Sequence, residues 1–312
     1  MTRKIGSQYQ PDDSFKAAAR LHQSNYRAKV LDVDYLDYGN RLTDADGRAL
    51  LNYYDGLGIR EALRQRYPQY SQRRDADLLR SEHIPFNMLA PLAGRPDLAR
   101  MIIKEAFKQE VDGPLELKLE WAPEPKYNYL DDMTSFDAYL QGVGTDGKLV
   151  GIGIEVKYTE RGYRIGKSEA KRVQDPNSTY WIMTRESGLF VENWSNDLFK
   201  DDLRQIWRNH LLGLAMVKRK DIARFVSVTL YPSGNIHFTH ALKKYQGHLI
   251  KSAQSSVHGS TFERFIECIQ GDHEIERWKQ FLIERYLVKY STFADKKIFQ
   301  HLEIVKQKHH QL

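Results

Sequence analysis

Residues 133–160 read MTSFDAYLQGVGTDGKLVGIGIEVKYTE, and this stretch decides the fold. Its two apolar runs, 133–141 and 149–157, are typical of β-strands because apolar, aromatic and β-branched side chains dominate them. Between the runs, Asp146 and Gly147 form an Asp-Gly pair, which favours a tight hairpin turn. We therefore predict an antiparallel hairpin in which residue i faces about residue 292 minus i.

Two carboxylates lie inside these apolar runs. In the predicted register Asp137 faces Glu155 to within a residue or so. Ionised carboxylates rarely occupy such runs unless they are paired or bind a metal, and two opposed carboxylates repel each other. A divalent cation between the two groups would remove that repulsion. Hard oxygen ligands select Mg²⁺ or Mn²⁺, and the backbone carbonyl of Val156 is a candidate third ligand.

Lys157 lies two residues beyond Glu155, so both side chains leave the same face of the strand. A carboxylate, an ammonium group and a metal together suit phosphodiester hydrolysis. The metal lowers the pKa of a water molecule, and the lysine holds that water or neutralises developing charge. The alternative is a solvated sheet face on which Asp137, Glu155 and Lys157 form a cross-strand ion pair.

The flanking sequence extends the hairpin into a larger sheet. Residues 81–109 favour one or two helices interrupted around Pro91 to Pro96, and alternation of leucine with charged residues predicts a strand at 115–120. After the hairpin, we expect an amphipathic helix at 197–218 and a strand at 225–231. The predicted core order is helix, strand, strand, strand, helix, strand.

The remaining chain is interpreted as additions to this core. Helices at 12–30 and 59–67 suggest a mostly helical N-terminal cap over residues 1–80, followed by a core over 81–240. A short strand is expected at 235–239. From Ser260 onward the chain is expected to be helical, which gives a helical C-terminal extension over 241–312.

Four blocks of sequence together resemble a poorly characterised bacterial group within the PD-(D/E)XK nuclease superfamily. They are SEHIPFN at 81–87, FDA at 136–138, IEVKYTE at 154–160 and RQIWRNHLL at 204–212. The resemblance covers roughly residues 20–240. The proline of the family name is absent, since Phe136 precedes Asp137.

This resemblance implies an α/β, restriction-endonuclease-like mixed β-sheet flanked by helices, with helical N- and C-terminal additions. It also implies Mg²⁺-dependent cleavage of DNA, with Asp137 and Glu155 as metal ligands and Lys157 as the catalytic lysine. Glu82 and Gln205 match positions where some members place further acidic and glutamine residues near the metal. The alternatives are an acid at a helix start for Glu82 and an exposed helix residue for Gln205.

Basic residues near the motif are candidate phosphate contacts. A run follows the catalytic strand directly and consists of Arg161, Arg164, Lys167, Lys171 and Arg172. Arg204 and Arg208 lie one helical turn apart and could grip a phosphate, or they could pair with Asp201 and Asp202. His210, on the apolar face of the same helix, is interpreted as a core histidine.

Composition limits the classes of partner. The chain has 312 residues and a net charge of +6, from 47 basic and 41 acidic residues, which favours a partner rich in phosphate. A single cysteine, Cys268, excludes an internal disulfide and a cysteine-rich zinc site. We find no apolar run of about 18 residues and no secretory signal, so a cytoplasmic protein without a membrane partner is expected.

The sequence therefore predicts a metal-dependent deoxyribonuclease of DNA restriction, phage defence or repair. One rival is a nucleic-acid-binding protein on a nuclease fold without activity, against which the intact Asp137, Glu155 and Lys157 argue. A second rival is an RNA-directed nuclease, because the active-site chemistry does not distinguish the sugars. A homodimer and a separate protein that supplies targeting both stay open.

Overall fold

The hairpin around Asp146 forms in the predicted register. In the computed structural model, which describes residues 3–162 and 166–288, strand β2 (Phe136–Val143) pairs antiparallel with β3 (Leu149–Val156). Ala138 lies opposite Ile154, and Val143 lies opposite Leu149. One step beyond the first pair, the register places Asp137 opposite Glu155, as expected.

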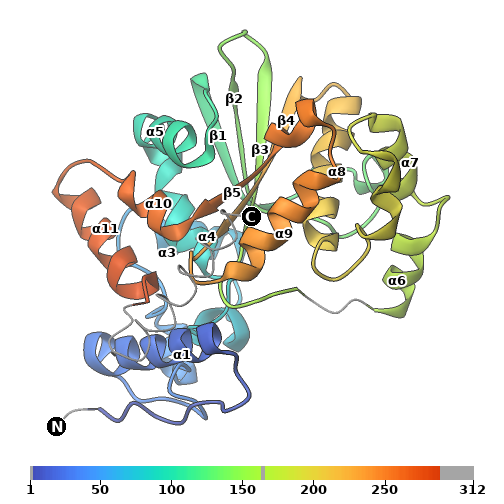
Figure 1. Cartoon of the computed structure of the whole chain (residues 1–312). Coiled ribbons are helices and arrows are strands. Elements are labelled where there is room, and N and C mark those ends of the chain that lie inside the picture. Colours follow the sequence, from blue (N-terminus) through green and yellow to red (C-terminus); the bar gives the residue numbers. More distant parts are fainter. Residues whose placement is uncertain (1–2, 163–165, 289–312) are drawn as a thin grey trace, which may run out of the picture.

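Within these described residues, five strands form one mixed sheet in sequence order (Figure 1). Strand β1 (Asp112–Trp121) pairs antiparallel with β2, whereas β4 (Arg224–Tyr231) and β5 (Val257–Thr261) continue the sheet parallel to β3. A parallel pair needs a long crossover connection. The segment between β3 and β4 supplies it with α6 (Lys167–Gln174), α7 (Thr179–Ser187) and α8 (Arg204–Lys218), and α9 (Ile236–Gly247) links β4 to β5.

Helices cover both faces of this sheet, as the restriction-endonuclease-like prediction requires (Figure 1). One core contains α4 (Ile84–Leu89), α5 (Pro96–Phe107), α10 (Phe262–Glu267) and α11 (His273–Tyr286), which pack with Ile152, Ile154 and Val156 of β3. The other contains α7, α8 and α9. The N-terminal helices are α1 (Ser14–Tyr26), α2 (Asp44–Arg48) and α3 (Ile59–Arg66).

Three expectations for the chain after β3 differ from the structure. Residues 235–239 begin helix α9 instead of forming a strand, because Phe238, Ala241, Leu242 and Tyr245 bury one helical face. The fifth strand, Val257–Thr261, was missed because HGST carries no apolar run; its pairing with β4 forms the strand. The helix expected from residue 197 begins at Arg204.

Close backbone approach sets helix α8 against the sheet. A Cβ added at Gly213 would lie 2.0 Å from the Phe225 ring, and one at Gly153 would lie 2.5 Å from the Phe136 ring. Larger side chains at these glycines would push α8 away from β3 and β4. No helix among the described residues is long and apolar enough to cross a membrane.

The C-terminal helix α11 is tied to α4 by buried polar contacts. Asn87 is fully buried; its amide donates to the Asn52 carbonyl at 3.0 Å and to the Tyr286 hydroxyl at 2.7 Å. Its side-chain oxygen accepts the Tyr54 amide at 3.0 Å. Trp278 donates to the Asn87 carbonyl at 2.8 Å, so one residue links α4, α11 and the N-terminal region.

We predict that Asn87→Ala destabilises the protein by about 2–4 kcal/mol, because it leaves several buried polar groups without partners. Denaturant unfolding measures this loss. The control Asn177→Ala, at an exposed position, should stay within about 0.5 kcal/mol of the wild type. Equal unfolding midpoints for Asn87→Ala and the control would contradict the role given to this contact.

Candidate active site

Glu155 is held on the side of the sheet that faces α8. Ile154 and Val156 point into the opposite core, so the strand alternation directs Glu155 and Lys157 towards α8. Glu155 Oε1 lies 2.7 Å from Lys157 Nζ. Gln205 also donates to Oε1, and Asn209 donates to Oε2 at 2.6 Å. Because both donors sit one turn apart on α8, the helix presents them to the same carboxylate.

Lys157 remains charged although only 8% of its surface is exposed. Burial lowers the pKa of its ammonium group, but the negative charges of Glu155, Asp137 and Glu160 outweigh burial and raise that pKa above its ordinary value. A buried lysine that keeps its charge beside two carboxylates can stabilise a developing oxyanion.

Asp137 completes the motif on the neighbouring strand. Its Oδ2 accepts the backbone N–H of Val156 at 2.6 Å, and no described residue donates a hydrogen bond to its Oδ1. Burial, and then repulsion from Glu155 and Glu120, raise the pKa of the Asp137 carboxyl well above its ordinary value. The carboxylate is therefore close to other negative charge that Lys157 does not fully balance.

Glu120 is a third acidic residue of this site, and the sequence interpretation missed it. Strand β1 pairs Leu119 with Ala138 and Trp121 with Phe136, which places Glu120 opposite Asp137. Burial, with repulsion from Glu155 and Glu82, raises the pKa of Glu120 to about 7 against the opposing hydrogen bond from Tyr67. Its backbone φ of 50° is unusual for a residue other than glycine, and such strain is frequent at functional sites.

The donors at this site fit an open divalent-cation site. Asp137 and Glu155 offer hard carboxylate oxygens, and their mutual repulsion would fall if a cation lay between them. Among residues 3–162 and 166–288, no group of three His, Cys, Asp or Glu side chains is arranged to hold a metal ion. Mg²⁺ is compatible with that donor set, because it commonly uses one or two carboxylates and keeps several waters.

The two further catalytic candidates from the sequence, Gln205 and Glu82, differ from each other in their contacts. Gln205 contacts Glu155 directly. Glu82 instead forms an ion pair with Arg73 at 2.8 Å, and its charge acts on Glu120. Asn209 was not singled out from the sequence; its position four residues after Gln205 was the available signal.

In the basic run that follows β3, Arg161 and Arg172 are engaged within the protein. Arg161 pairs with Asp13 at 3.2 Å, and Arg172 donates to the backbone carbonyls of Leu130 and Asp131. Lys167 and Lys171 are exposed on α6, whereas Arg164 lies outside the described residues. A nucleic-acid role for this run stays a prediction.

Arg204 and Arg208 are buried and form ion pairs. Arg204 contacts Asp201 at 2.7 Å, which is one of the two alternatives raised by the sequence. Arg208 contacts Asp132 at 3.0 Å and also Glu169, so it does not use Asp202. Both arginines therefore tie α8 to neighbouring segments, and a phosphate contact by either of them stays a prediction.

His210 lies in the core as expected. Its two ring nitrogens are 3.1 Å from the hydroxyl groups of Tyr245 and Ser256. Burial lowers the pKa of its imidazole to about 3, so the ring is neutral near pH 7.

We predict that the metal-free protein loses stability as pH rises from about 4.5 towards 7. Glu120 binds its proton more tightly in the folded protein than in the unfolded chain, so this stability is present at low pH and is lost as the carboxyl ionises. The difference in unfolding free energy between wild type and Glu120→Gln should change across this range, by at most about 3 kcal/mol. If the two unfolding free energies, measured in EDTA, differ by the same amount at every pH, the pKa of Glu120 is not raised in the folded protein.

Comparison with known proteins identifies the family. A family model described as the PD-(D/E)XK nuclease superfamily matches residues 10–288. No curated protein and no solved structure matches the chain. The matched residues include the strands of the sheet, the helices on both of its faces, and Asp137, Glu155 and Lys157. This chain therefore belongs to the PD-(D/E)XK nuclease superfamily.

Proposed function

We propose that this protein is a metal-dependent endonuclease that hydrolyses DNA phosphodiester bonds with Mg²⁺ or Mn²⁺. The observation that carries the proposal is the buried contact of 2.7 Å between Lys157 and Glu155, with Asp137 on the adjacent strand. An ion pair that only stabilised the fold would need Lys157 and Glu155 alone. It would not need the Asp137 carboxylate beside it, which repels Glu155. That excess of negative charge supports a site for a cation rather than a cross-strand ion pair alone.

The protein residues divide the chemical work. Asp137 and Glu155, with the carbonyl of Val156, would hold the cation, which when bound would lower the pKa of a water molecule and polarise the phosphoryl group. Lys157 would donate to that water or to a phosphoryl oxygen. Gln205 and Asn209 fix the direction of the Glu155 carboxylate, and Glu120 adds negative charge on the far side of Asp137.

DNA is proposed as the substrate on the sequence resemblance and on the net charge of +6. An RNA-directed nuclease is the competing candidate, because the side chains described at the site do not by themselves distinguish RNA, with its 2′-hydroxyl group, from DNA. Restriction, phage defence or repair in the cytoplasm is the proposed setting. A homodimer and a targeting partner remain compatible with it.

We predict that Asp137→Ala, Glu155→Ala and Lys157→Ala each reduce cleavage by at least about 100-fold. The two carboxylate variants should also lose affinity for Mg²⁺ in calorimetry, whereas Lys157→Ala should keep it, because the ammonium group does not bind the cation. Plasmid, linear DNA, single-stranded DNA and RNA should be compared with Mg²⁺, Mn²⁺ and EDTA.

The control Lys148→Ala, at an exposed turn position between β2 and β3, should cut like the wild type. A wild type that cuts neither DNA nor RNA and binds no divalent cation would replace the proposal by the binding-protein alternative. Full activity in Lys157→Ala would show that the catalytic lysine is another residue.

We predict a separate positioning role for Asn209. Asn209→Ala removes the donor to Glu155 Oε2, so the carboxylate should lose its fixed direction and Mg²⁺ affinity or cleavage should fall about 10–100-fold. Asn209→Asp tests charge as well as shape, because it places another negative group against Glu155 and should be worse than alanine in metal-free stability. Unchanged metal affinity and cleavage rate in Asn209→Ala would remove Asn209 from the site.

A further inference from the structure

A cationic cavity lies where the N-terminal region meets the end of the catalytic strand. Its volume is about 240 Å³, and its charged lining residues are Lys16, Arg20, Arg41, Arg80, Asp77 and Glu160. Four basic and two acidic side chains thus line the cavity. Lys16 and Arg20 pair with Asp12, which leaves Arg41 and Arg80 as its more weakly paired cations. This excess suits an anionic ligand.

The two acidic groups do not satisfy the arginines. Arg41 and Arg80 approach Asp77 at only 3.9 and 3.5 Å. Oδ1 of Asp77 already accepts hydrogen bonds from Asn40 and from the Leu79 amide. No described residue accepts a hydrogen bond from the Arg80 side chain, and Arg41 makes one of 3.4 Å to Asp37. Most N–H donors of these two guanidinium groups are thus available to a ligand.

The cationic lining is held in place by neighbouring rings and side chains. Arg20 contacts Asp12 at 2.5 Å and Asn40 at 2.6 Å, and its guanidinium lies 5.4 Å from the centre of the Tyr38 ring. Arg41 lies 5.9 Å from the same ring. Because guanidinium groups already approach this ring, the cavity favours an oxyanion over a stacked base.

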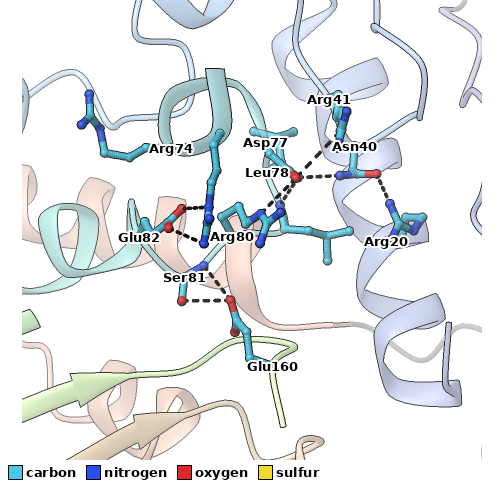
Figure 2. A network of polar contacts seen from close by, with 12 residues as sticks. Arg20, Asn40, Arg41, Arg74, Asp77, Leu78, Arg80, Ser81, Glu82 and Glu160 are labelled. Atoms are coloured by element: carbon cyan, nitrogen blue, oxygen red, sulfur yellow. Dashed lines mark hydrogen bonds and ion pairs between the residues drawn. The ribbon is translucent and has the colours of Figure 1, made fainter. Parts of the chain in front are cut away.

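The opposite wall of the cavity continues the catalytic strand (Figure 2). Glu160 Oε1 accepts the Ser81 amide at 3.2 Å and the Ser81 hydroxyl at 2.9 Å. Its other oxygen accepts the Tyr158 amide at 2.9 Å. Asn235 donates to the carbonyls of Tyr158 and Glu160. The cavity wall is therefore fixed only a few residues beyond Lys157.

We propose that this cavity binds a phosphate group of the nucleic-acid substrate, next to the phosphate that is cut. The inference rests on the proposed nuclease function. Planar guanidinium groups bind phosphate through paired hydrogen bonds, and Arg41 and Arg80 have donors free for that geometry. The N-terminal region is then a substrate-binding element. Arg41 and Arg80 also line an adjoining cavity of about 130 Å³ with Arg73, so the cationic surface continues outward.

The test measures binding without cleavage, in EDTA, by fluorescence anisotropy. Three fluorescently labelled, single-stranded DNA probes of one sequence are compared. The first has a 5′-phosphate, the second has a 5′-hydroxyl, and the third is a closed circle. Arg41→Gln/Arg80→Gln should weaken binding at least about tenfold. The slope of log affinity against log salt should fall by about 0.7 for one lost phosphate contact.

The matched control is Arg95→Gln/Arg264→Gln. These two arginines are similarly exposed and each pairs with a glutamate, at 2.9 and 2.8 Å. The control removes the same charge from two side chains that do not line the cavity, and it should lose much less affinity. Should the double variant fail to fold, Arg80→Gln carries the same comparison, because that side chain donates no hydrogen bond to any described residue.

The three probes distinguish the source of the phosphate. A loss confined to the 5′-phosphorylated probe assigns the cavity to a terminal phosphate, and an equal loss on all three assigns it to an internal one. A wild type that binds the probes, together with an Arg41→Gln/Arg80→Gln variant that matches the control, overturns this inference alone. A wild type that binds neither the probes, nor duplex DNA, nor RNA overturns the proposed function as well.

Discussion

The buried carboxylate of Glu155 is the constraint on which the site depends. A charge with 8% of its residue surface exposed needs partners, and here one comes from its own strand and two from α8. Helix α8 must therefore lie close to β3, which Gly153 and Gly213 permit by leaving room for the aromatic rings between the layers. The packing of the crossover between β3 and β4 therefore also sets the geometry of the candidate site.

The same site keeps negative charge that the protein does not neutralise. Asp137 has one backbone donor, and Glu120 lies opposite it with a hydrogen bond from Tyr67. Burial, and then repulsion among the acids of the site, raises the pKa values of Asp137 and Glu120 and destabilises the ionised, metal-free protein. Such a local loss of stability is common where a site is built for a ligand that supplies the missing charge.

The N-terminal region contributes more than a cover for the core. Ser81 donates to Glu160 just beyond strand β3, and Gln23 of α1 donates to the Tyr158 hydroxyl and to the Arg285 carbonyl. These contacts hold α1, the end of β3 and α11 as neighbours (Figure 1). A substrate phosphate bound between Arg41 and Arg80 would lie on this fixed frame, where its position relative to Lys157 changes little.

The sequence by itself determined the hairpin, its register and the placing of Asp137 opposite Glu155, with Lys157 two residues further along. Strand alternation and the turn at Asp146 act over a few residues, so they can be derived without knowing the rest of the fold. The order of the main core elements was predictable for the same reason.

Tertiary structure alone decided the partners that come from distant segments. The β1–β2 register brought Glu120 to Asp137, α8 brought Asn209 to Glu155, and pairing with β4 made a strand of Val257–Thr261. It also turned Arg208 towards Asp132 and Glu169. These contacts join residues far apart in the chain, and only packing fixes which of the available partners a buried charge or an edge strand meets.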